Sequence, residues 1–186
     1  MVPKNYDQLI EIYEALAAHG YREVGQEYLQ NVLDTAKQLD AYDSGRIYYY
    51  LGEYQKAYLA LDEARDKGGA DSYLYLGRAY AATGDYNYAS SVYNNYLSKQ
   101  GPNAEIYNEL GLCEMAKKEY QNALAAFQAG KQIEGNSLMQ TLCFNEIVAY
   151  EYLEDYQQAE ILMNAYLQNY PDDQTAIREQ QFLSTR

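Results

Sequence analysis

The sequence lacks tryptophan and contains only two cysteines, three prolines and one histidine. Two cysteines, Cys113 and Cys143, cannot supply the disulfide framework of a small secreted domain, and together with one histidine they cannot assemble a soft-metal site. No uninterrupted apolar run approaches the ~20 residues that a membrane span requires, so we expect no membrane insertion. Few prolines and little clustering of β-branched residues favour helices over strands.

Positive charge is also scarce, because 14 Lys and Arg residues stand against 27 Asp and Glu residues, for a net charge of −13. A surface this acidic repels phosphate backbones, so we expect no nucleic-acid partner. Hydrophobic residues make up 48% of the 186 residues, which is enough for one globular domain with a core of its own.

Tyrosine is abundant, with 24 residues against 3 phenylalanines, and several tyrosines recur at a fixed period. Four hexapeptides, at 52–57, 84–89, 118–123 and 154–159, carry tyrosine at their third position and alanine at their sixth. A second apolar stripe precedes two of them most clearly, at Tyr73-x-x-Leu76-Gly77 and at Tyr107-x-x-Leu110-Gly111. Two amphipathic stretches separated by a short turn predict a helix–turn–helix unit of about 34 residues.

Small and polar residues occupy positions that suit such a unit. Gly77, Gly111 and the recurring alanines allow two helices to approach closely. The side chains placed to cap a helix N-terminus are those of Asp85, Asp155, Asn103, Asn136 and Asp172.

These motifs resemble the tetratricopeptide repeat (TPR) family, as in its bacterial arrays. The resemblance implies an all-α fold, a right-handed α-α superhelical solenoid of about five helix pairs plus a C-terminal capping helix. The repeats are expected at residues 5–36, 39–68, 71–102, 104–135 and 138–171, with the capping helix at 173–184, all within one domain spanning residues 1–186.

Two repeats depart from the pattern. In the first, the turn through 18–20 must be two residues longer than usual, and Val24 falls in the alanine position. In the fifth, Phe144-Asn145-Glu146-Ile147 copies the stripe that begins at Tyr107 and implies a turn one residue shorter, whereas the standard count places Cys143 at the aromatic position. We favour the copied register.

Nothing in the sequence assembles a catalytic or cofactor site. His19 falls in a predicted turn without a partner that would orient it, and Cys113 and Cys143 fall on predicted helices as small core residues. No phosphate-binding glycine loop or zinc-protease motif is present. We therefore expect a protein that is not an enzyme and that holds no cofactor and no metal.

In TPR proteins the first helices of the repeats line a concave groove, and the resemblance implies a peptide-binding groove here. The positions carried over are Tyr42, Arg46, Tyr49, Leu74, Tyr75, Arg78, Asn108, Glu109 and Asn145. Arg46 and Arg78 occupy equivalent places in successive repeats and can receive an acidic group of a partner. Alternatively, the tyrosines pack between helices and the arginines pair with Asp43 or Glu109.

The resemblance favours a scaffold that binds a protein or peptide partner, and the acidic charge of the chain favours a partner of basic or neutral-polar character. If the groove interpretation holds, charge reversal at both Arg46 and Arg78 abolishes binding without lowering the melting temperature. The alternative is a self-associating repeat that forms a homodimer through tyrosines expected to be exposed on second helices, namely Tyr58, Tyr88, Tyr96 and Tyr166.

The start of the sequence, Met1-Val2-Pro3-Lys4, leads into the first repeat without a hydrophobic signal segment, as in a cytoplasmic protein. The same arrangement arises when an extracytoplasmic or membrane-anchored protein is expressed without its signal, so both locations stay open.

Overall fold

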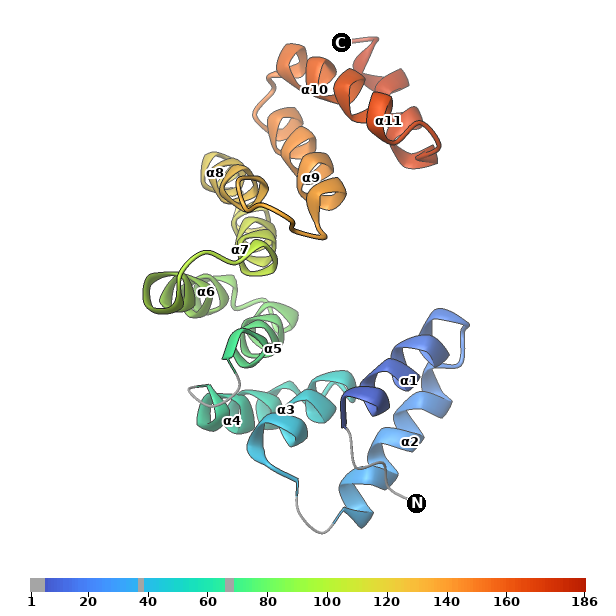
Figure 1. Ribbon diagram of the computed structural model, residues 1–186, viewed down its shortest axis with the longest axis vertical. Helices are drawn as coiled ribbons and strands as arrows, with labels where there is room; N and C mark the ends of the chain where they lie inside the picture. The colour runs from blue at the N-terminus through green and yellow to red at the C-terminus, as the bar shows by residue number, and fades with distance from the viewer. Residues whose placement is uncertain (1–5, 37–38, 66–68) are drawn as a thin grey trace. The chain divides into compact units, whose positions relative to one another are not determined.

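The computed structural model describes residues 6–36, 39–65 and 69–186, and within these ranges the chain forms helices and turns without strands (Figure 1). The predicted all-α solenoid of helix pairs is thereby confirmed. Residues 1–5, which hold the chain start and the first residue of the first expected repeat, lie outside the described residues. So do residues 66–68, the last three of the second expected repeat. The chain divides into two compact units, Met1–Asp85 and Tyr86–Arg186, and a single domain stays a prediction.

The described residues of the first unit form five helices, each packed against its neighbours in the chain. α3 also contacts α5, so that two first helices of successive repeats lie side by side. The helices are α1 (Tyr6–Ala18), α2 (Arg22–Thr35), α3 (Ala41–Tyr50), α4 (Tyr54–Ala64) and α5 (Gly69–Ala82).

The second unit continues the same alternation and ends on a single helix that packs against the last pair. Its helices are α6 (Tyr86–Gln100), α7 (Ala104–Ala116), α8 (Tyr120–Lys131), α9 (Met139–Tyr152), α10 (Tyr156–Asn169) and α11 (Gln174–Leu183). The unit boundary between Asp85 and Tyr86 falls inside the segment 71–102 that the sequence assigns to one repeat.

The turns within the five helix pairs share one geometry. Each has three residues, and its middle residue has a positive φ, between 60° and 85°. In each, a backbone N–H donates to the carbonyl five residues earlier, as from Tyr21 to Leu16 and from Asp155 to Tyr150. This bond satisfies a carbonyl that the helix end leaves open.

The shared turn corrects the first repeat, where a longer turn was expected. Since the turn at 19–21 has the usual length, the buried Gly25 takes the alanine position, and Val24 is exposed. A Cβ atom at Gly25 would lie 2.8 Å from Cδ2 of Tyr13. Tyr13, at the position of Gly111, fills space that glycine leaves at the position where the other repeats have alanine.

The shared turn also corrects the favoured register of the fifth repeat. The turn at 153–155 is not one residue shorter, so Cys143 precedes Tyr156 by the same thirteen residues that separate Tyr107 from Tyr120. Ile147 then takes the place of Gly111, and it packs against Met163 as Gly111 packs against Phe127.

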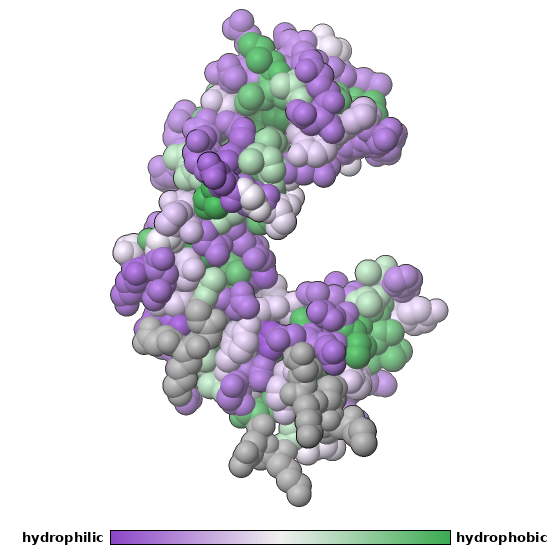
Figure 2. All heavy atoms as spheres, in the orientation of Figure 1, coloured by the Kyte–Doolittle hydropathy of each residue, from purple (hydrophilic) through white to green (hydrophobic). Residues whose placement is uncertain are grey.

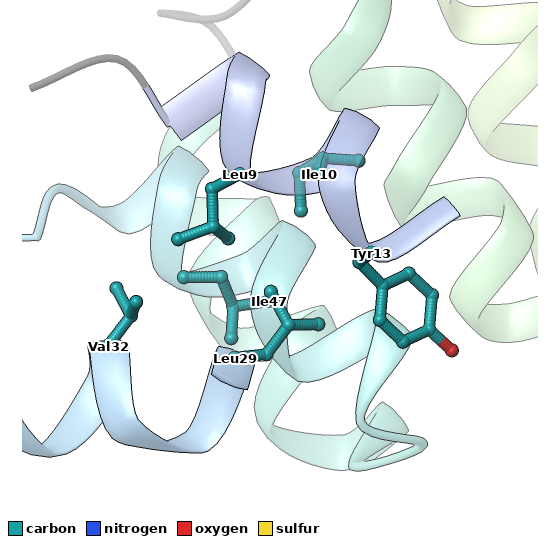
Figure 3. Packing of buried hydrophobic residues seen from close by; sticks show 6 residues of the cluster. All are labelled: Leu9, Ile10, Tyr13, Leu29, Val32 and Ile47. Carbon is teal, nitrogen blue, oxygen red and sulfur yellow. The ribbon is translucent and has the colours of Figure 1, made fainter. Parts of the chain in front are cut away.

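Large and small residues fit together in the interior of each unit. In the first unit, one cluster joins Leu9, Ile10 and Tyr13 of α1 to Leu29 and Val32 of α2 and Ile47 of α3 (Figure 3). A Cβ atom at Gly111 would lie 2.3 Å from Cε1 of the buried Phe127, which confirms that a small residue is needed for α7 and α8 to approach.

Side chains cap several of the helices. Asn103 accepts a hydrogen bond from the backbone N–H of Ile106 at the start of α7, and Asp155 accepts one from Gln158 at the start of α10. The cap of α11 is Asp173 and not Asp172, because the Asp173 carboxylate accepts from the backbone N–H groups of Thr175 and Ala176.

Candidate functional site

Within the first unit, predicted groove residues of α3 and α5 meet around Tyr75. The Tyr75 ring centroid lies 5.6 Å from that of Tyr49 and 5.9 Å from that of Tyr50, both edge-on. The hydroxyl groups of Tyr75 and Tyr50 are 3.1 Å apart, and the Arg78 guanidinium carbon lies 5.8 Å from the Tyr75 ring centroid. These residues form an aromatic surface with a cation at its edge.

Arg46 takes a different position from the one that the resemblance implied. It is only 5% exposed, and its guanidinium donates to Asp7 Oδ1 over 2.7 Å and to Asp43 Oδ1 over 2.5 Å. Burial lowers the pKa of Arg46, but the hydrogen bonds to both carboxylates more than offset this and raise it overall. The side chain therefore pairs within the unit, as in the alternative interpretation that the sequence left open.

Tyr42 and Leu74 also have partners inside the first unit. Arg46 lies 4.3 Å from the centroid of the Tyr42 ring, and the Tyr42 hydroxyl donates to Asp71 Oδ2 over 3.3 Å. Burial, which is opposed by Arg46, raises the pKa of Tyr42 above its ordinary value. Leu74 is buried, so its side chain offers no open surface.

In the second unit, two predicted groove residues meet across consecutive first helices. The Asn145 side-chain amide on α9 donates to Asn108 Oδ1 on α7 over 2.9 Å. Asn108 is buried, while Asn145 and Glu109 are half-buried. Because these residues and the Tyr75 surface belong to different compact units, a single groove through all of them stays a prediction.

The sequence analysis missed residues that complete the surface of the first unit. Tyr50 donates to Glu14 Oε1 over 2.5 Å, and its carbonyl accepts from the Tyr13 hydroxyl. Asp7, the partner of Arg46, lies on α1. The run of three tyrosines at 48–50 was the available signal for an aromatic surface. The pairing of Tyr50 with Glu14, 36 residues away, and of Arg46 with Asp7, 39 residues away, leaves no local pattern in the sequence.

The residues considered for catalysis lie in one turn and on two helices. His19 is exposed in its turn, with Nδ1 2.8 Å from the carbonyl oxygen of Ala15. Burial raises the pKa of the Cys113 thiol to about 12, and Cys143 is half-buried. Among the described residues, no group of three or more His, Cys, Asp or Glu is placed to hold a metal ion. No helix within those ranges is long and apolar enough to cross a membrane.

A family model described as Tetratricopeptide repeat matches residues 42–89 and 76–136, which together cover just over half of the chain. The chain belongs to the tetratricopeptide repeat family. TPR proteins are in general non-catalytic scaffolds for protein–protein interaction. None of the curated proteins matches this TPR chain.

Solved TPR structures share the fold at low sequence identity. A thermophilic TPR protein of Thermus thermophilus is 16% identical, with a TM-score of 0.73, over 98% of this chain and 100% of that one. A TPR protein of Parabacteroides merdae is 18% identical, with a TM-score of 0.67, over 96% and 72%. MamA of Desulfovibrio magneticus is 16% identical, with a TM-score of 0.64, over 93% and 99%.

Proposed function

We propose that this TPR chain is a non-enzymatic scaffold that binds a peptide or protein segment on the groove face of its first helices. The arrangement around Tyr75 supports the proposal most directly. Tyr49 on α3 lies beside Tyr75 on α5, with Arg78 next to the Tyr75 ring, where two first helices of successive repeats contact each other. Tyrosine rings give a large contact area at low entropic cost, and their hydroxyl groups can hydrogen-bond to a peptide backbone.

The role of the two arginines differs in this proposal. Arg46 holds α3 to α1 through Asp7, so its charge serves the fold. Arg78 is half-buried beside Tyr75 and supplies the cation at the edge of the surface. Charge reversal at Arg46 would place a third carboxylate against Asp7 and Asp43 and lower stability, so Arg78 is the position at which binding is tested.

The test uses the full chain and peptides selected from a random-sequence displayed library. We expect Arg78→Glu to weaken binding of the selected peptides about tenfold or more, as for a charged residue inside a contact surface. Leu59→Ser is the matched control, because Leu59 is 77% exposed on α4, a second helix of the same unit. Equal affinities of the wild type and Arg78→Glu, measured by fluorescence polarisation, would show that the surface is not the binding site.

Self-association is the second candidate, and exposed apolar side chains on second helices favour it. Tyr88 on α6 and Ile161 on α10 are exposed, as is Leu59. Of the other tyrosines expected there, Tyr166 is buried and donates to Asp173, and Tyr58 is stacked on Tyr80 with ring centroids 4.4 Å apart. A monomer mass by light scattering at micromolar concentration would remove this candidate.

A further inference from the structure

The first unit contains a pocket of about 320 Å³ between the C-terminal ends of α1 and α3. Four tyrosines line it, Tyr13, Tyr49, Tyr50 and Tyr54, together with Glu14 and Arg22. This volume is at the lower end of the range of ~300–1,000 Å³ for ligand pockets and suits one long side chain. Tyr49 connects the pocket to the Tyr75 surface, so the inference rests on the proposed function.

The rings of the pocket lie at steep angles to one another. Tyr49 lies 5.2 Å from Tyr50 at 74° and 6.0 Å from Tyr54 at 56°, and Tyr13 lies 4.9 Å from Tyr50 at 52°, measured between ring centroids and planes. Rings tilted in this way present faces as well as edges to the space between them. An aromatic face carries negative charge density and attracts a cation.

The pocket also includes a carboxylate, that of Glu14, and lies at the C-terminal end of α3. Glu14 accepts a hydrogen bond from the Tyr50 hydroxyl. Burial first, and then this hydrogen bond, raise the pKa of Tyr50, so the phenol stays a neutral donor. The Tyr50 carbonyl at the C-terminal end of α3 lies at the negative end of the helix dipole. Residues 1–85 carry 14 Asp and Glu against 8 Lys and Arg, so the unit attracts cations at long range.

We propose that this pocket binds the ammonium or guanidinium group of a lysine or arginine side chain on the partner segment. The tyrosine faces receive the cation, and the Glu14 carboxylate, which the Tyr50 hydroxyl fixes in place, balances its charge. Arg22 is exposed at the start of α2 and is the one cation among the lining residues, so it opposes binding. An acidic ligand would instead be attracted by Arg22 and repelled by Glu14.

The experiment titrates the full ¹⁵N-labelled chain with blocked pentapeptides Gly-Gly-X-Gly-Gly, where X is Lys, Arg, norleucine or Glu. We expect saturable shifts of the pocket residues with Lys and Arg, and binding at least about tenfold weaker with norleucine and Glu, because neither provides a cation for the rings. Glu14→Gln should weaken Lys binding about fivefold, since it keeps an acceptor for Tyr50 but removes the charge.

Two further variants test whether the pocket binds a positively charged group. Arg22→Gln should strengthen Lys binding by about twofold or more, because it removes the opposing charge. Glu27→Gln on α2 is the control, because Glu27 is exposed, is not among the lining residues and should leave binding unchanged. The proposal is overturned if norleucine binds as well as lysine, if the Glu peptide binds and depends on Arg22, or if no pentapeptide binds.

The outcomes also separate this proposal from the proposed function. A library-selected segment that loses affinity with Arg78→Glu but not with Glu14→Gln leaves the scaffold function in place and overturns the cation pocket. If the lysine pentapeptide binds in a way that depends on Glu14, but no library peptide that binds the chain can be selected, the cation pocket is supported and the groove function is overturned.

Discussion

The carboxyl group of Glu151, near the end of α9, lies close to that of Glu179 on the final helix α11. Two carboxyl groups can hydrogen-bond only when at least one of them holds a proton. Burial, with the nearby Glu179 carboxyl, raises the pKa of Glu151 to about 7. We therefore expect the attachment of the final helix to depend on pH near neutrality.

The stability of the second unit should fall as pH rises through this range. The folded pKa of Glu151 lies above the ordinary value of 4.5, so the unfolded chain loses the proton first, and stability declines between about pH 4.5 and about pH 7. After solvent screening, we expect a loss of about 1 kcal/mol. Urea unfolding at pH 5 and pH 8 measures it, and Glu151→Gln should flatten the difference. An equal pH dependence in Glu151→Gln would show that the pair does not share a proton.

The turns of the last two helix pairs have side chains at a position that favours glycine. Lys118 has a φ of 64° and Glu154 a φ of 60°, where earlier turns have Gly20, Gly52 and Gly84. Since residues with a Cβ atom pay about 1 kcal/mol in the left-handed region, Lys118→Gly and Glu154→Gly should each raise the free energy of unfolding by up to that amount.

The reverse substitution is the comparison. Gly52→Ala should lower the free energy of unfolding by about 1 kcal/mol, although a Cβ atom there meets nothing within 4 Å. Destabilisation by Lys118→Gly in chemical denaturation would mean that its side chain contributes more than the backbone strain costs.

Gly111 on α7 contacts Phe127 on α8 so closely that one added methyl group at Gly111 would overlap the phenylalanine ring. Gly111→Ala should lower the free energy of unfolding by about 1–3 kcal/mol, even though alanine is the better helix former. The double variant Gly111→Ala/Phe127→Leu should lose less than the sum of the two single variants, because the smaller side chain relieves the overlap. Additive losses in a double-mutant cycle would contradict the contact.

Arg46 holds α1 and α3 together through a paired and largely buried charge. Arg46→Gln should lower the free energy of unfolding by about 2–3 kcal/mol, because it leaves the half-buried Asp43 without its cation. Burial, opposed by Arg46, already raises the pKa of Asp43 above its ordinary value. Arg65→Gln is the control, since Arg65 pairs with the more exposed Asp62 and should change stability by less than about 0.5 kcal/mol. Similar melting temperatures for both variants would show that the Arg46 pairs are not stabilising.

The local pattern of the sequence was sufficient for the helix pairs. Tyrosine and alanine recur three residues apart at the start of four second helices, and the alanines Ala57, Ala89, Ala123 and Ala159 are all fully buried. The local pattern was insufficient where the sizes of two side chains compensate for each other, as at Tyr13 and Gly25. The register errors in the first and fifth repeats arose because residue similarity was weighed above a constant turn.

The sequence by itself determined the all-α class, the repeat of helix pairs and the positions of most turns, because these depend on spacing and on local backbone geometry. Only the tertiary structure decided that Arg46 pairs with Asp7, which tyrosines are buried and which of them surround a pocket with Glu14. The contacts of Tyr50 with Tyr75 and Glu14 and of Arg46 with Asp7 join residues 25 to 39 positions apart, and their geometry depends on how successive helices pack.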